Sequence, residues 1–381
     1  MCNVESEMKN PFIYSKFVTG TCFCNRKKEQ DDLFEFIRAS QDILIYSHRR
    51  TGKSSLIKQV FLNIRQKAPE IGALYVDLYG TTSEKEFITR VFHQLSALET
   101  STDKLLKLLK SSLDKFSFQI SVDPVTGSPV IAPSFRSADE NFVLKNLMDL
   151  LEKLSKKRKL VIALDEFQEV AKYVNADPFE KQLRSYIQQQ SNICYIFSGS
   201  QRHLLTAMFQ SRGRAFYRQA YSYPLQRIET KHYIPWMAKL FAAGNLSIDK
   251  TAIQTIVERF ENHPMYIQLF CFFLWRELQQ NGWNDQTVKR IESRMLDQKH
   301  LEYQTLWDNL SINQKKTLKL VVNNDGQNLF AAEALTAVNI KTASVVTRCL
   351  KTLSQKEILS KNGNYVIQDL FLKKWLSLQT V

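Results

Sequence analysis

The sequence predicts an α/β protein in which helices cover both faces of a parallel sheet, followed by two smaller parts. From about residue 30 to residue 227, short apolar segments alternate with segments of helical spacing, the pattern of parallel strands joined by helices. After residue 227 the strand-like segments stop and amphipathic helices follow one another. Residues 311–381 then combine helices with a glycine-turned hairpin.

The composition fits this prediction and excludes other classes. A chain of 381 residues has room for two or three domains with real cores. It is 44% hydrophobic and 24% charged, with only 11 Gly and 9 Pro, which argues against fibrous and disordered proteins. The six cysteines are scattered, and Cys22 and Cys24 lack a second pair of ligands, so we expect neither disulfides nor a zinc site.

The charge and the hydropathy pattern limit the partners. Lys and Arg number 52 against 38 Asp and Glu, a net charge of +14, which favours nucleic acid, a nucleotide or a membrane surface without choosing among them. The first ten residues lack the basic and apolar regions of a secretory signal. The aromatic-rich run 266–275 is too short for a bilayer, which needs about 20 helical residues. We therefore expect a cytoplasmic protein without a membrane partner.

The first part contains at least four candidate strands and one candidate hairpin. Residues 43–47, 73–78, 160–164 and 193–197 are short apolar runs bounded by helical patterns, and we expect them to form the parallel sheet. Residues 116–135 alternate on both sides of a Gly-bearing turn, which predicts a hairpin inserted into this part.

Three domains follow from these elements. We expect an α/β core over residues 1–227, a helical domain over 228–310 and a third domain over 311–381. In the third domain, three helices precede a hairpin that turns at Gly363. That order is the winged form of helix-turn-helix.

A phosphate-binding loop is predicted at Ser47-His-Arg-Arg-Thr-Gly-Lys-Ser-Ser55, which follows a strand and opens a helix. Gly52 permits close backbone approach, Lys53 neutralises phosphate charge and Ser54 can ligate Mg²⁺. Ser47 stands where the GxxxxGK[ST] pattern has its first glycine. A basic turn opening an ordinary helix is the alternative. The residues whose backbone would surround the phosphates are Arg49, Arg50, Thr51, Gly52, Lys53, Ser54 and Ser55.

Two carboxylates end a later apolar run, Leu160-Val-Ile-Ala-Leu-Asp165-Glu166. We expect this run to form the strand next to that of the loop, which would bring Asp165 to the Mg²⁺ ion. Glu166 would then orient the water that attacks the γ-phosphate. An acidic strand end without a catalytic role is the alternative.

Two further groups are candidates for the same chemistry. Ser198 ends the run 193–198 at the sheet edge where ligands of open α/β sheets bind, and we expect it to sense the γ-phosphate. Arg212, Arg214 and Arg218 lie close together in the sequence, and one of them could stabilise transition-state charge, from this chain or a neighbouring subunit. A polar strand end and a basic loop are the alternatives.

These motifs resemble the archaeal-type ATPase family, a branch of the AAA-plus ATPases. The resemblance rests on SHRRTGKSSL, LDEFQ, FSGS and HPMYIQ, and it extends from about Phe12 to Trp375. It implies a P-loop NTPase core, a helical lid and a winged helix, and it selects ATP over GTP. It also assigns the ATPase roles of Lys53, Ser54, Asp165, Glu166 and Ser198.

The resemblance adds residues outside the loop. The motif that contains Asn25 and Arg26 is similar to the family's entry motif near the adenine. The lid motif, which usually begins Gly-His-Pro, reads Asn262-His-Pro264 here and implies that Pro264 contacts the nucleotide. The usual Arg-Pro-Phe-Tyr is Arg214-Ala-Phe-Tyr, so Arg214 is the finger that the resemblance favours.

The third domain is strongly basic. Residues 311–381 hold nine Lys and one Arg against two Asp and two Glu, a net charge of +6. Double-stranded DNA is therefore the expected partner, bound mainly through phosphates. A winged helix that docks a protein or stabilises the lid is the alternative. The basic residues on or near the expected recognition helix and wing are Lys341, Arg348, Lys351, Lys356 and Lys361.

The sequence thus predicts a Mg²⁺-dependent ATPase whose nucleotide state is coupled to a DNA-binding winged helix. A nucleotide-binding regulatory scaffold with low turnover, acting through protein docking, is the alternative. A protein partner and assembly with further copies of the chain both stay open. A DNA-binding protein with a vestigial core is disfavoured, because every type of phosphate-contacting residue is present.

Overall fold

The computed structural model describes residues 9–98, 117–122, 129–134, 140–284 and 286–379. It divides into two compact units. One unit is Ser15–Ile228, and the other joins Met1–Tyr14 to Glu229–Val381. No helix among the described residues is long and apolar enough to cross a membrane.

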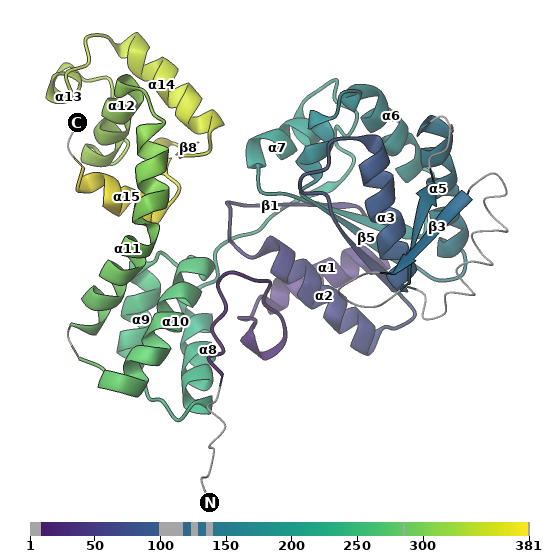
Figure 1. The fold of residues 1–381 in the computed structure, drawn as a ribbon, viewed down its shortest axis with the longest axis horizontal. Coiled ribbons are helices and arrows are strands. Elements are labelled where there is room, and N and C mark those ends of the chain that lie inside the picture. Colours follow the sequence, from purple (N-terminus) through teal and green to yellow (C-terminus); the bar gives the residue numbers. More distant parts are fainter. Residues whose placement is uncertain (1–8, 99–116, 123–128, 135–139, 285, 380–381) are drawn as a thin grey trace, which may run out of the picture. The chain divides into compact units, whose positions relative to one another are not determined.

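The unit Ser15–Ile228 is built on a five-stranded sheet in the order β2-β5-β6-β1-β7, and every neighbouring pair is parallel (Figure 1). All residues of β5 and β6 are buried, as expected for strands covered on both faces. The predicted parallel sheet is confirmed. The strands are β1 (Ile43–Tyr46), β2 (Gly72–Asp77), β5 (Leu160–Asp165), β6 (Ile193–Ser198) and β7 (Tyr221–Pro224).

Two details of the sheet differ from the sequence prediction. β5 does not lie next to β1, because β6 is inserted between them. An apolar run in the sequence does not reveal which strands it will pair with. β7 was not predicted, because its sequence Tyr-Ser-Tyr-Pro shows no apolar alternation; as an edge strand it tolerates Pro224.

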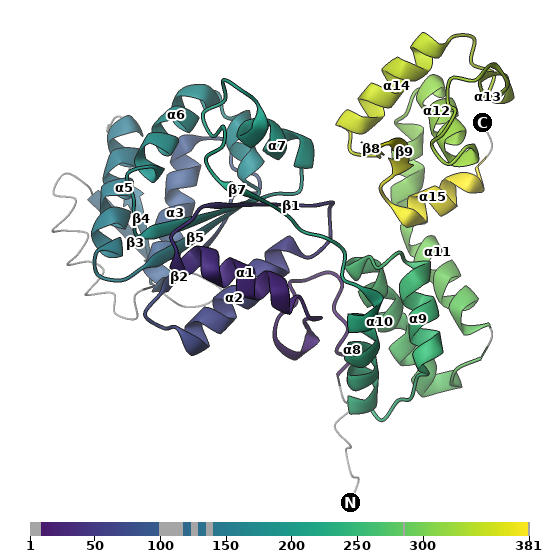
Figure 2. The same cartoon turned by 180° about the vertical axis from the view of Figure 1, so that it is seen from behind.

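Helices cover both faces of this sheet (Figures 1 and 2). α1 and α2 pack on one face, where Leu33, Leu56 and Ile196 belong to one apolar cluster. α3, α5, α6 and α7 pack on the other face in a second cluster. These helices are α1 (Lys27–Arg38), α2 (Lys53–Lys67), α3 (Glu84–Leu98), α5 (Glu140–Ser155), α6 (Ala176–Ile187) and α7 (Arg202–Gln210).

Short elements complete the unit. Two 3₁₀ helices, η1 (Gly20–Cys22) and η2 (Phe167–Lys172), precede α1 and follow β5. β3 (Ser117–Val122) and β4 (Pro129–Ser134) pair as antiparallel strands at the place of the expected hairpin. The expected turn, including Gly127, lies outside the described residues.

The second unit begins with helices around an aromatic core. Phe12 is buried and its ring contacts the rings of Trp236, Phe241 and Trp275. The amide of Ile13 donates a hydrogen bond to Gln268 Oε1 (3.1 Å), so the N-terminal segment is part of this core. The helices are α8 (Thr230–Ala243), α9 (Lys250–Arg259), α10 (Pro264–Asn281) and α11 (Thr287–Asp308).

A winged helix follows in the same unit. Ser311 caps its first helix, and its hydroxyl accepts a hydrogen bond from the Gln314 amide. Trp375 is buried against Tyr303 and Trp307, which ties the last helix to α11. The predicted helices and wing are confirmed. They are α12 (Ile312–Asn323), α13 (Ala332–Ala337), α14 (Ala343–Gln355), β8 (Leu359–Asn362), β9 (Asn364–Ile367) and α15 (Leu370–Ser377).

Candidate functional site

The predicted phosphate loop connects β1 to α2. Gly52 caps α2 with φ +93°, a conformation that side chains rarely adopt, so glycine is required there. Ser47 has no positive φ, so its backbone conformation does not require a glycine at this position. Instead, the buried hydroxyl of Ser47 hydrogen-bonds with the hydroxyl of Thr51 and closes the loop on itself.

Lys53 lies across this loop. Its Nζ donates to Ser47 Oγ and to the carbonyl oxygen of His48, both at 3.3 Å. Burial and the nearby cations Arg202, Arg227 and Lys53 lower the pKa of His48, which favours its neutral form. The ammonium of Lys53 is held beside the loop by these two bonds.

Arg26 supports the loop from outside. It is 2% exposed, and its Nη2 donates to the carbonyl oxygen of Thr51 (3.1 Å) while its Nη1 pairs with Glu29 (2.7 Å). The carbonyl oxygen of Asn25 accepts a hydrogen bond from the Gln30 side chain (2.8 Å). The entry motif therefore meets the phosphate loop, and its role near an adenine stays a prediction.

Hydroxyl groups from three separate elements donate hydrogen bonds to Asp165. Ser54 Oγ, in the first turn of α2, donates to Asp165 Oδ2 (2.6 Å). Ser198 Oγ, at the end of β6, donates to Oδ1 (2.6 Å). Tyr75 on β2 also donates its hydroxyl to Oδ2. Burial and the Asp165 charge raise the pKa of Tyr75, so its phenol stays a donor.

The topology explains this meeting point. Parallel strands end at the same edge of the sheet, and Asp77 and Asp165 are register partners on β2 and β5. Tyr75 lies two residues earlier on β2, on the face covered by α2, so its long side chain can reach Asp165. The sequence analysis missed Tyr75, because a tyrosine within an apolar strand predicts only core packing.

Glu166 follows Asp165 in a left-handed conformation with φ +56°. Its Oε2 accepts hydrogen bonds from the backbone N–H of Ser200 (3.0 Å), the hydroxyl of Ser200 (2.8 Å) and the side-chain amide of Gln168. A Cβ on Gly199 would lie 1.9 Å from Gln168 Oε1. The glycine in the strand-end sequence FSGS therefore makes room for the groups that hold Glu166.

Two other predicted residues, Arg214 and Pro264, are not among the described residues that bond to Asp165 or Glu166. Arg214 pairs with Glu180, which is buried on α6. Pro264 is the first residue of α10, in the other compact unit. Neither the finger role of Arg214 nor the nucleotide contact of Pro264 follows from these positions.

The residues around Asp165 suit a magnesium ion. Mg²⁺ prefers hard oxygen ligands and is usually held by one or two carboxylates together with substrate phosphates. The Ser54 hydroxyl and the Asp165 carboxylate provide such oxygens beside the phosphate loop. No group of three or more His, Cys, Asp or Glu suited to a metal occurs in the part of the chain that the structure describes.

The basic residues of the winged helix form two sets, one bonded within the unit and one exposed. Lys319, Lys373 and Lys374, for example, bond to carbonyl or carboxylate oxygens within the unit. The five basic residues singled out by the sequence are exposed, and none forms an ion pair among the described residues. They lie on or next to α14 and the wing: Lys341, Arg348, Lys351, Lys356 and Lys361.

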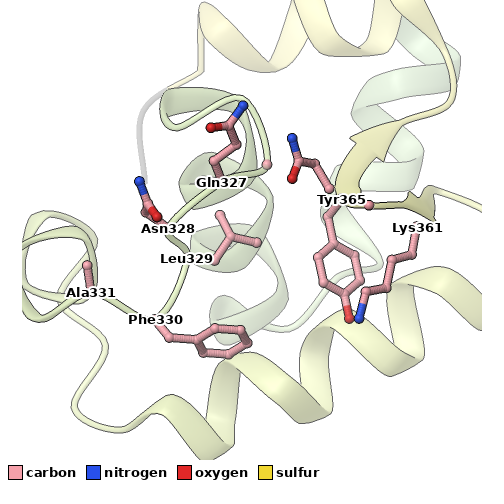
Figure 3. Close-up of a pocket in the computed structure, with 10 residues that line it drawn as sticks. Gln327, Asn328, Leu329, Phe330, Ala331, Lys361 and Tyr365 are labelled. Carbon is pink, nitrogen blue, oxygen red and sulfur yellow. The ribbon is translucent and has the colours of Figure 1, made fainter.

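A pocket of about 520 Å³ lies between the wing and the loop 326–331 (Figure 3). Phe330 is half exposed at this pocket, and Lys361 Nζ lies 5.3 Å from the ring centroid of Tyr365. Gly326 allows the loop 326–331 to approach the wing closely, since a Cβ at this position would lie 1.8 Å from the Tyr365 carbonyl oxygen. The pocket thus combines aromatic rings with one ammonium group.

Comparisons with solved structures show this fold in other proteins. A Walker-type ATPase of Pyrococcus abyssi is similar over 97% of this chain and 100% of its own, with 19% identity and a TM-score of 0.68. The ORC2 protein of Aeropyrum pernix, solved with ADPNP and ADP, is similar over 92% of each chain, with 13% identity and a TM-score of 0.55. The ORC1 protein of the same organism, solved in complex with DNA, covers 93% of this chain and 92% of its own, with 12% identity and a TM-score of 0.50.

Family models give the assignment. A comparison with curated proteins finds no significant match. Residues 301–378 match a family described as "probable winged helix domain". Residues 23–270 match the family described as "ATPase domain predominantly from Archaea". Because this match covers more than half of the chain, the protein belongs to that ATPase family.

Proposed function

We propose that this ATPase hydrolyses ATP with Mg²⁺ and couples its nucleotide state to DNA binding by the winged helix. The observation that carries the proposal is the hydrogen bond between Ser54 Oγ and Asp165 Oδ2. These residues are 111 positions apart, and the fold brings them together beside Lys53. A loop hydroxyl and a strand-end carboxylate in this arrangement can hold Mg²⁺ against bound phosphates.

The chain's own residues would divide the work as follows. The backbone of residues 49–55 binds the phosphates, and Lys53 turns from the Ser47 hydroxyl and the His48 carbonyl oxygen to the β- and γ-phosphates. Ser54 and Asp165 hold Mg²⁺, which neutralises charge that develops on the phosphate oxygens. Glu166 orients the attacking water, and Ser198, which donates to Asp165 Oδ1 at the carboxyl edge of the sheet, senses the γ-phosphate through that carboxylate.

The domain boundaries of the sequence analysis complete the proposal. Residues 15–227 form the ATPase core, 228–310 the lid and 311–381 the winged helix. The core begins later than the sequence predicts, because the segment that contains Phe12 packs on the lid helices. Pro264, at the start of α10, would touch the nucleotide when the lid closes. Arg214 would act as a finger only after leaving Glu180, which ties this role to a rearrangement near α6.

The separation of basic residues supports DNA as the partner. Lysines that bond within the unit contribute to its stability, whereas the exposed cations of α14 and the wing are available to phosphates. Arg348 and Lys351 are three residues apart on α14 and therefore share one helix face. Few of these side chains suit base readout, so we expect binding led by phosphates and shape.

One observation favours the alternative of a low-turnover scaffold. Glu166 Oε2 already accepts three hydrogen bonds, one of them from the backbone of Ser200. These donors hold the carboxylate in one orientation, so Glu166 can act on a water placed away from Oε1 only after it turns. Slow reorientation would leave a protein that binds nucleotide, turns it over rarely and docks a protein through the winged helix.

Phosphate release from ATP and from GTP, with and without duplex DNA, tests the proposal. We expect Mg²⁺-dependent release from ATP, and Glu166→Gln should keep ATP affinity while losing at least a hundredfold in turnover, because an amide cannot act as the base. Wild-type turnover in this variant would remove Glu166 from its role. ATP binding without measurable release in the wild type would favour the scaffold.

DNA binding is tested by its dependence on salt. Replacing Lys351 and Lys361 with Gln should lower the slope of log K against log[salt] by about 0.9 for each lost phosphate contact, equally for unrelated sequences. Lys319→Gln is the matched control, since Lys319 bonds to carbonyl oxygens within the unit. If the full-length protein with ATP does not bind duplex DNA at low salt, the basic surface is a protein-docking face.

A further inference from the structure

We infer that the Tyr75 hydroxyl competes with Mg²⁺ for Asp165 and so sets the Mg²⁺ concentration that the nucleotide site requires. The inference rests on the proposed function, in which Asp165 is a partner of the metal. It adds a residue from β2 that neither the phosphate loop nor the acidic strand end contains.

The carboxylate of Asp165 is fully hydrogen-bonded in this structure. Asp165 Oδ2 accepts from Ser54 and Tyr75, and Oδ1 accepts from Ser198 and from the backbone N–H of Glu166 (3.1 Å). A carboxylate offers about four acceptor positions on its two oxygens. Four donors therefore saturate Asp165, and neither Mg²⁺ nor a water it holds can approach until one donor leaves.

Of these four donors to Asp165, the Tyr75 hydroxyl is the one that can leave most easily. The Glu166 amide is fixed by the chain next to Asp165, and the Ser198 side chain is fully buried at the end of β6. Ser54 is a proposed metal ligand, and its hydroxyl hydrogen can still point to Asp165 when its oxygen binds Mg²⁺. Tyr75 is partly exposed and comes from another strand, so its hydroxyl can move to water at the least cost.

The surroundings of Tyr75 support this assignment. The ammonium of Lys58 lies 4.3 Å from the Tyr75 ring centroid and 3.6 Å from that of Phe17. These contacts use the faces of the rings and not the phenol oxygen. The ring therefore has its own anchors, and removing the hydroxyl alone should leave it in place.

The test is Tyr75→Phe, with Tyr223→Phe as a matched control. Tyr223, on β7, donates its hydroxyl to Asp32 (2.7 Å), so the control loses the same kind of bond away from Asp165. Binding of a non-hydrolysable ATP analogue is measured by calorimetry over a series of Mg²⁺ concentrations. Shifts of the melting temperature with Mg²⁺ and the analogue give a second readout and show that each variant is folded.

We expect Tyr75→Phe to lower the Mg²⁺ concentration for half-maximal analogue affinity by roughly tenfold. A hydrogen bond to a charged group is worth about 1.5 kcal/mol, close to one factor of ten in an equilibrium constant. Affinity without Mg²⁺ should not change, and Tyr223→Phe should titrate like the wild type.

Two results would overturn the inference while the proposed function stands. An unchanged Mg²⁺ requirement would show that Tyr75 does not compete, and a higher one would show that it positions Asp165 for the metal. If analogue binding by the wild type does not depend on Mg²⁺ at all, both the inference and the proposed metal site are wrong.

Discussion

Replacing Gly199 with Ala would test how Glu166 is held. Gly199 follows β6, and a Cβ at this position would lie 1.9 Å from Gln168 Oε1 and 3.0 Å from Gln168 Cδ. Gln168 is fully buried, so its side chain cannot swing into solvent. The added methyl group must therefore displace an amide that donates a hydrogen bond to Glu166.

The structure allows the size of this effect to be worked out. Forcing an extra methyl group into a packed core costs about 1–3 kcal/mol. For a unit of the size of Ser15–Ile228, each kcal/mol lowers the melting temperature by about 2–4 °C, so the expected loss is roughly 2–12 °C. A shift of about 1 Å in a catalytic group costs about a hundredfold in rate, which sets the expected loss of turnover.

Turnover, ATP affinity and melting temperature are measured together in this assay. ATP affinity should stay within about twofold of wild type, because Gly199 lies at Glu166 and Gln168 and not in the loop 47–52. Gln168→Ala opens the space that the new methyl group needs, so the double variant should be more stable than additivity predicts. Wild-type turnover and stability in Gly199→Ala would refute the close approach that this reasoning requires.

Two further predictions concern charge. Lys53→Ala should weaken ATP binding at least a hundredfold in calorimetry, because it removes the cation that the loop holds for the phosphates; unchanged affinity would contradict its role. Burial raises the pKa of the Asp42 carboxyl group to about 6, so the folded protein binds a proton at Asp42 more tightly than the unfolded chain does. This group therefore stabilises the fold at low pH, and that contribution is lost as the pH rises through about 6. Between pH 4 and pH 7, the free energy of unfolding of Asp42→Asn in urea should therefore rise by up to about 3 kcal/mol relative to that of the wild type. A difference between the two proteins that does not change with pH would refute the raised pKa.

The strands that could be predicted are those whose burial is visible in the sequence as an apolar run. β5 and β6 are covered on both faces, so they appear as continuous apolar runs. β7 lies at the sheet edge and its residues are exposed or half-buried, so it shows no such run. The position of β6 between β1 and β5 follows from packing between distant segments, which no local pattern records.

The same distinction applies to the site. Gly52, Lys53 and Ser54 could be predicted because a phosphate loop works through consecutive residues, so its chemistry is visible as a motif. Tyr75 could not, because its contact is with Asp165, 90 positions away in the sequence. Arg26 was predicted from family resemblance, but its bond to the Thr51 carbonyl depends on the folded loop.

The two carboxylates of the site are held in different ways, and this difference separates a working ATPase from a scaffold. Asp165 accepts one bond from a partly exposed phenol that can turn away. Glu166 accepts three bonds on one oxygen, one of them from the backbone N–H of Ser200 just beyond β6. Metal binding would then need one side chain to move, whereas a turn of Glu166 would break several contacts with the segment that follows β6. A ligand that shifts this segment would therefore control turnover more strongly than nucleotide affinity.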